Sequence, residues 1–174
     1  MLINDDILAL KRGWKVGFGD DDDFIDYFFA NYDCDTTRHI MRNDRGEVVA
    51  QMHYFIFDDT ECGEKGCYIY GVTTLPEWRG KRLAQTMINE VIDRLRELGI
   101  AYAVLIAQEE GLRKWYEKLG FRLMTHSIDV LGAKDNMNFA MDDTSLNKGM
   151  YYTLKEGIQN FSTKLKIENG KWEN

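Results

Sequence analysis

The chain has 174 residues, 44% of them apolar, and includes 4 Trp, 9 Tyr and 9 Phe, so it fits one globular domain and is not a disordered chain. No apolar run approaches the ~20 residues of a membrane span, and residues 1–6 carry no basic-then-apolar signal, so we expect a cytoplasmic protein with no membrane partner. The net charge of −7 disfavours nucleic acid as a partner; it is ordinary for solubility and would also suit a cationic partner or substrate.

Two helices are expected at the start of the chain. The first lies near residues 3–12 and is followed by a loop over Gly13–Gly19. The acidic run Asp20–Asp23 precedes the apolar run Phe24–Phe29, as capping residues precede a helix. Capping is the favoured interpretation of this run, and recognition of a cationic substrate is the alternative.

Three strands are expected next. Arg38–Asn43 and Val48–Phe57 form a hairpin around a turn that contains Gly46. After a polar loop, Cys67–Thr74 forms the third strand. Gly71 inside it indicates a bulge or a close approach of the backbone to another group.

The middle of the chain predicts a strand–helix–strand unit. Arg82–Leu98 carries apolar residues at three- and four-residue spacings, which predicts an amphipathic helix that ends at Gly99. Ala101–Ala107 is almost continuously apolar, which is typical of a central strand covered on both faces. The strands on either side of this helix should therefore be parallel.

A second helix, Glu109–Leu119, should stop at Gly120 and lead to the strand Phe121–Thr125. Of the last 50 residues, we predict only a strand at Met150–Leu154 and a turn at Asn169–Gly170.

The three cysteines do not form a metal-binding pattern. Cys34, Cys62 and Cys67 combine with His39 and His53 into no complete zinc-ligand spacing. We therefore expect free thiols in a reducing compartment, and no metal.

Three basic residues crowd the start of the amphipathic helix predicted at Arg82–Leu98. Arg79, Lys81 and Arg82 stand where the helix dipole is already positive. Such a local conflict is typical of functional sites, and an anion bound to the free N–H groups would resolve it. A solvated basic turn is the alternative.

The order of segments in this part of the chain resembles the central motif of the GNAT superfamily of N-acetyltransferases. The order is the predicted strand, then Thr73–Pro76, then Arg79–Ala84, then the predicted helix. The family's loop reads Gln/Arg-x-x-Gly-x-Gly/Ala, and Arg82 stands at the middle glycine, where its guanidinium could contact phosphate. Leu112–Phe121 resembles the family's second signature. The N-terminal run through Phe24–Phe29 resembles the same region of bacterial members related to the enhanced-intracellular-survival acetyltransferases. The resemblance spans roughly residues 1–125.

This resemblance implies an α/β fold. The expected sheet is mixed and mostly antiparallel, with six or seven strands, helices on both faces and one parallel pair at the cofactor cleft. Residues 1–174 would form a single GNAT domain, with helices and a hairpin in 1–66, the acetyl-CoA-binding core in 67–125 and further strands in 126–174.

The resemblance also implies site residues. Tyr116 would donate a proton to the departing thiolate, although its spacing alone suits a core residue. A backbone N–H near Val72 would stabilise the charge that develops on the thioester oxygen. The residues implied to bind the cofactor are Val72, Thr73, Thr74, Arg79, Gly80, Lys81, Arg82, Leu83, Ala84 and Gly111.

No general base and no acceptor pocket is assigned. The candidate bases are Glu109, Glu110, His53 and the C-terminal carboxylate of Asn174. The candidate acceptor contacts are Tyr27, Phe28, Tyr54 and Tyr151, because such pockets combine aromatic walls with few polar groups.

The leading hypothesis is an acetyl-CoA-dependent N-acetyltransferase that acts on a primary amine of a small molecule or peptide by direct attack. A non-catalytic acyl-CoA-binding module with the same fold is the second hypothesis, because Arg82 and Gly111 depart from the family's pattern. A basic-loop module that binds another anion, such as nucleic acid, is the third. A homodimer is one option that the sequence leaves open.

Overall fold

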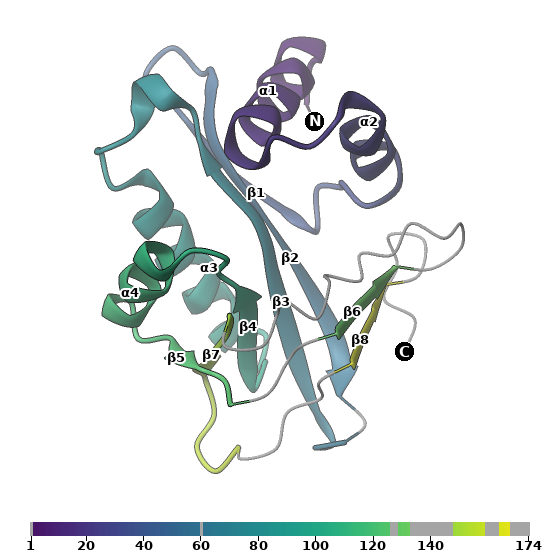
Figure 1. Cartoon of the computed structure of the whole chain (residues 1–174), viewed down its shortest axis with the longest axis vertical. Helices are drawn as coiled ribbons and strands as arrows, with labels where there is room; N and C mark the ends of the chain where they lie inside the picture. The colour runs from purple at the N-terminus through teal and green to yellow at the C-terminus, as the bar shows by residue number, and fades with distance from the viewer. Residues whose placement is uncertain (1, 60, 126–128, 133–147, 159–163, 168–174) are drawn as a thin grey trace. The chain divides into compact units, whose positions relative to one another are not determined.

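The computed structural model describes residues 2–59, 61–125, 129–132, 148–158 and 164–167 (Figure 1). The chain packs as two compact units. The first comprises Met1–Tyr54 and Tyr70–Val91, and the second comprises Phe55–Ile69 and Ile92–Asn174.

The described strands form a six-stranded sheet in the order β1-β2-β3-β4-β7-β5 and a separate pair, β6-β8. Within the larger sheet β3 and β4 are parallel, whereas β1–β2, β4–β7 and β5–β7 are antiparallel; β6 and β8 are parallel. The mixed α/β architecture, the hairpin and the parallel pair predicted from the sequence are therefore confirmed. The strands are β1 Arg38–Arg42, β2 Val48–Asp59, β3 Glu64–Thr74, β4 Tyr102–Ile106, β5 Arg122–Leu123, β6 Asp129–Gly132, β7 Gly149–Thr153 and β8 Lys164–Ile167.

The first unit begins with two helices, α1 (Asn4–Phe18) and α2 (Asp22–Asn31), which lie together in Figure 1. The loop predicted over Gly13–Gly19 is wrong, because α1 continues to Phe18 and ends at Gly19, which has a φ of 75°. Gly13 and Gly17 are packing positions instead. A Cβ on Gly17 would lie 2.5 Å from Thr73 Cγ2 of β3, so the absent side chain allows the helix to approach the strand.

The acidic run before α2 has divided roles. The Asp21 side chain accepts a hydrogen bond from Phe24 N at 2.7 Å, which confirms the predicted cap. Asp22 pairs with Lys15 at 3.0 Å. Asp20 instead accepts a hydrogen bond from Trp14 Nε1 at 2.7 Å, so its side chain faces α1 and not the start of α2.

Trp14 forms the centre of the core of this unit. It is fully buried, and its ring centroid lies 4.3 Å from that of Phe28 and 5.8 Å from that of His53. A Cβ added to Gly71 would lie 2.7 Å from Trp14 Cζ3, and Gly71 has a φ of 63°. The close approach predicted at Gly71 is thus confirmed, and the group that approaches is the indole.

The second unit is built around β4, which is buried along most of its length between β3 and β7. Tyr102 donates a hydrogen bond to Asp59 Oδ2 at 2.5 Å, and this ties β4 to the end of β2. Helix α4 (Glu110–Lys118) follows β4, and Gly120 with a φ of 96° comes after it. Helix α3 (Leu83–Glu97) contributes residues to both units.

Several predicted boundaries differ from the structure. β3 begins at Glu64, three residues before the predicted start at Cys67, and β5 is limited to Arg122–Leu123. The predicted turn at Asn169–Gly170 lies outside the described residues. Among the helices that the structure describes, none is long and apolar enough to cross a membrane.

Candidate functional site

The basic turn joins the short 3-10 helix η1 (Pro76–Trp78) to α3 in the first unit. Arg82 has a φ of 61° and is the one non-glycine residue with a positive φ in the described part of the chain. Its carbonyl accepts a hydrogen bond from Thr86 N at 3.0 Å, so α3 starts directly after it. A left-handed conformation costs a side-chain-bearing residue about 1–2 kcal/mol. This cost marks the turn as a place where backbone shape matters.

The side chains of the turn add positive charge to a helix end without a carboxylate. No acidic residue lies in the first turn of α3. Arg79 Nε donates to Thr74 O at 3.2 Å, and Lys81 Nζ lies 3.8 Å from the centre of the Trp78 ring. The first N–H groups of an α-helix have no intrahelical acceptor. The predicted conflict with the helix dipole is therefore present, and the turn offers both N–H donors and cations to an anion.

The end of β3 precedes this turn. The parallel ladder joins Gly66–Tyr68 to Tyr102–Val104 and stops there, although β3 runs on to Thr74. Thr73 is buried and its Oγ1 faces Gly13 of α1, whereas Val72 and Thr74 are half-buried. Extended backbone beyond the end of a ladder can hydrogen-bond an extended ligand.

Tyr116 belongs to the second unit. It lies on α4, is 7% exposed, and its ring centroid is 5.5 Å from that of Phe121. Burial raises the pKa of Tyr116, so its hydroxyl keeps its proton near neutral pH. Leu112, one turn earlier on α4, is 45% exposed. Gly111 lies in the first turn of α4, where an added Cβ would meet no atom within 4 Å.

Comparison with known proteins decides the family. The model of the acetyltransferase (GNAT) family matches residues 5–121, which include β3, the basic turn, α3 and α4. The chain belongs to this family. No curated protein sequence matches it.

Solved GNAT structures share the fold at low identity. A GNAT N-acetyltransferase (YhbS) from Escherichia coli in complex with CoA has 16% identity and a TM-score of 0.63, over 97% of this chain and 86% of that one. The ribosomal-protein-S18-alanine N-acetyltransferase from Escherichia coli has 16% identity and a TM-score of 0.61, over 92% and 96%. A GNAT acetyltransferase from Staphylococcus aureus Mu50 has 15% identity and a TM-score of 0.60, over 88% and 96%.

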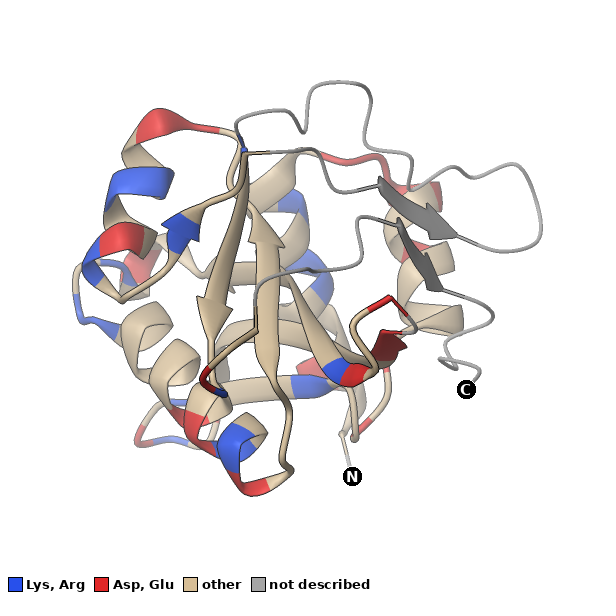
Figure 2. Cartoon of the chain, turned by 90° about the horizontal axis from the view of Figure 1, so that it is seen from below, with Lys and Arg blue, Asp and Glu red and all other residues tan. Residues whose placement is uncertain are grey.

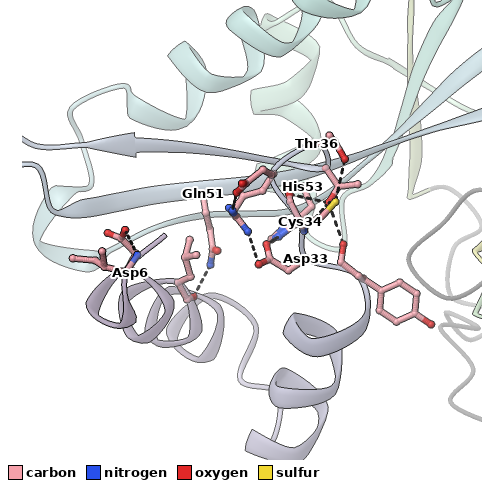
Figure 3. A network of polar contacts seen from close by, with 12 residues as sticks. Asp6, Asp33, Cys34, Thr36, Gln51 and His53 are labelled. Atoms are coloured by element: carbon pink, nitrogen blue, oxygen red, sulfur yellow. Dashed lines mark hydrogen bonds and ion pairs between the residues drawn. The ribbon is translucent and has the colours of Figure 1, made fainter. Parts of the chain in front are cut away.

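The candidate bases of this GNAT chain lie in contrasting surroundings. His53 is fully buried, its Nε2 lies 2.9 Å from Asp33 Oδ1, and burial lowers its pKa (Figure 3). Glu110 is exposed, and its hydrogen bond with Lys114 lowers its pKa. Glu109 occupies the N-cap position of α4 without a side-chain cap bond, and Asn174 lies outside the described residues.

The candidate acceptor contacts are divided between the two units. Phe28 is core, since it is buried against Trp14. Tyr27 and Tyr54 are half-buried in the first unit, and Tyr151 is half-buried on β7 in the second. In the described residues, no three or more His, Cys, Asp or Glu side chains gather as a metal site, and the three cysteines are free thiols.

Proposed function

We propose that this GNAT protein transfers the acetyl group of acetyl-CoA to a primary amine of a small molecule or peptide, in the cytoplasm. The observation that carries the proposal is the backbone of Arg82. It adopts a glycine-like left-handed conformation at the position where the family motif has glycine. This conformation supports the proposal that the loop binds phosphate despite the substitution. The E. coli neighbour that holds CoA supports a CoA-type cosubstrate.

The proposed reaction needs no covalent enzyme intermediate. The amine nitrogen attacks the thioester carbonyl carbon, the C–N bond forms and the C–S bond breaks. The sulfur leaves with the bonding electrons and takes the proton of Tyr116, and the nitrogen releases a proton to solvent or to a base. A backbone N–H near Val72 would stabilise the negative charge on oxygen in the transition state. We also propose that the cofactor contacts the remaining residues of the β3 end, the basic turn and α4. These are Thr73, Thr74, Arg79, Gly80, Lys81, Leu83, Ala84 and Gly111.

The experiment is to measure CoA release with a panel of polyamines, aminoglycosides, amino acids and peptide N-termini, using Tyr116→Phe beside the wild type. Tyr116→Phe should lower kcat by about 100-fold or more, because it removes the proton donor, while acetyl-CoA affinity stays within about two-fold. Tyr152→Phe is the matched control: its hydroxyl accepts a hydrogen bond from Arg96, so activity should remain. Equal kcat in Tyr116→Phe and wild type would remove Tyr116 from the reaction.

A non-catalytic acyl-CoA-binding module is the second candidate. Gly111 favours it, because open space replaces a side chain in the first turn of α4. Calorimetry separates the two: binding of acetyl-CoA without turnover of any amine would favour the module.

A further inference from the structure

Two aromatic rings, one exposed and one half-buried, lie where α1 ends. Phe18 is 46% exposed, and Tyr70 of β3 is half-buried beside it. Their ring planes are within 13° of parallel, with centroids 6.4 Å apart. Buried Trp14 supports both, at 5.2 Å from Phe18 and 5.4 Å from Tyr70. The three rings thus pack against one another in the first unit.

A carboxylate is fixed next to these rings. Asp20 Oδ2 accepts the Trp14 Nε1 hydrogen bond at 2.7 Å, which orients the carboxylate towards the aromatic cluster. Burial, and after it the negative charge of Asp20, raises the pKa of Tyr70, which agrees with a carboxylate near that ring. In the described part of the chain no ion pair of Asp20 is found, and Lys15 pairs with Asp22. The aromatic faces and the carboxylate together match the requirements of an organic cation.

We propose that Phe18, Tyr70 and Asp20 form a binding site for an organic ammonium group, and that this group is a second cationic centre of the acetyl acceptor. The second part rests on the proposed function. Such surroundings stabilise the protonated form of an amine, whereas an amine must lose its proton before it attacks a thioester. The ammonium bound here is therefore not the nucleophile. The acceptor class that fits is a small diamine or polyamine, which binds through one nitrogen and reacts through another.

The site itself is tested with a cation that cannot be acetylated. Choline and its neutral isostere 3,3-dimethylbutan-1-ol are titrated while the assigned Trp14 Nε1–H resonance is followed by NMR. Choline should shift this resonance and bind at least ten-fold more tightly than the alcohol. Asp20→Asn keeps an acceptor for the indole but removes the charge, and should weaken choline binding at least ten-fold. Phe18→Leu should weaken it about three- to ten-fold.

Asp23→Asn is the matched control, because Asp23 belongs to the same acidic run and is exposed. It should change choline affinity less than two-fold. Equal weakening by Asp20→Asn and Asp23→Asn would overturn the site, since it would show a general attraction by the acidic loop. Equal binding of choline and the neutral alcohol would overturn it as well.

The acceptor class is tested by turnover. Linear α,ω-diamines of three to eight carbons are compared with monoamines of the same length. At least one diamine should exceed its monoamine at least ten-fold in kcat/KM, and Asp20→Asn should remove this advantage through KM while the KM of acetyl-CoA is unchanged. Equal use of both series would overturn the second cationic centre but not the acetyltransferase. Failure to bind acetyl-CoA would overturn the proposed function, and the choline titration would still decide the ammonium site.

Discussion

Arg82 combines a left-handed backbone with a positively charged side chain at a motif position where glycine is usual. Glycine adopts a left-handed conformation without a steric penalty, but arginine does not. The substitution at the motif position is visible in the sequence, whereas its φ of 61° is not, because backbone angles depend on how η1 and α3 are joined. The guanidinium therefore comes with a local conformational penalty.

Replacing Arg82 by glycine should raise the free energy of unfolding. The strain of about 1–2 kcal/mol disappears, and the greater freedom of glycine in the unfolded chain offsets about 0.5–1 kcal/mol of it. Denaturant unfolding should thus show a gain of up to about 1 kcal/mol. Lys81→Gly is the control, because Lys81 has no positive φ, and it should destabilise the protein. A loss of stability in Arg82→Gly would show that the guanidinium contributes more than the backbone strain.

At the scale of elements, the glycines of α1 made the predicted end of this helix wrong. Gly13 and Gly17 resemble loop signals in a linear sequence, but in the structure they form the face of α1 that meets Thr73. The β-hairpin, α3, β4 and α4 were predictable because their apolar periods are regular and glycines end the two helices. Close contact between α1 and β3 is tertiary packing, which periodicity does not reveal.

Gly17→Ala should destabilise the protein. The new Cβ would lie 2.5 Å from Thr73 Cγ2, and overpacking of this kind costs about 1–3 kcal/mol. Gly111→Ala is a matched helical control: its Cβ would meet open space, so helix propensity should stabilise the protein by up to about 1 kcal/mol. Thermal unfolding of both variants checks this, and a more stable Gly17→Ala would contradict the packing role of Gly17.

An ion pair joins the start of α1 to β1, and it should make the free energy of unfolding depend on pH in the acidic range. Asp6 accepts hydrogen bonds from Ile3 N and from Arg42 Nη1 and Nη2 at 3.0, 2.6 and 2.9 Å. Arg42 chiefly lowers the pKa of Asp6 from 3.8 to about 2. The folded-state pKa is the lower one, so the contribution to stability is complete above about pH 4 and is lost as the pH falls towards 2.

Asp6→Asn should therefore unfold more easily at pH 7, by about 1–3 kcal/mol, and should lose less stability than the wild type between pH 4 and 2. Denaturant titrations at several pH values measure this. Asp5→Asn, at the exposed neighbouring position, is the control and should follow the wild type. Parallel pH curves for Asp6→Asn and wild type would exclude the pair as the cause.

At the scale of the whole molecule, the net charge of −7 conceals an uneven distribution. Figure 2 shows acidic and basic residues interspersed over helices and loops. Arg79, Lys81 and Arg82 nevertheless stand together at the start of α3. Net charge alone argues against a phosphate-bearing ligand, and the position of these charges argues for one. The sequence alone places these three charges together, whereas it contains no sign of the ring contact between Phe18 and Tyr70, because no sequence spacing relates the end of α1 to β3.

Arg79→Ala and Lys81→Ala should each weaken CoA binding about five-fold or more at low salt and less than two-fold at 0.5 M salt, because exposed charges are screened. Calorimetry at two ionic strengths measures this. Arg94→Ala, which removes a charge from the opposite end of α3, is the control and should bind like the wild type at both. Unchanged affinity in both test variants would show that the basic turn is a solvated surface that does not bind CoA.

The path of the chain through its two units restricts how the gene can be divided. Residues 55–69 belong to the second unit, but in the sequence they come between the two segments of the first unit. A piece that begins at Ile92 therefore lacks the parts of β2 and β3 that the second unit contains. Splitting the gene at this point should give halves that regain a fold only when they are produced together. Such complementation would make the protein a candidate for a split reporter, whereas expressing either unit as a shortened clone should give insoluble product.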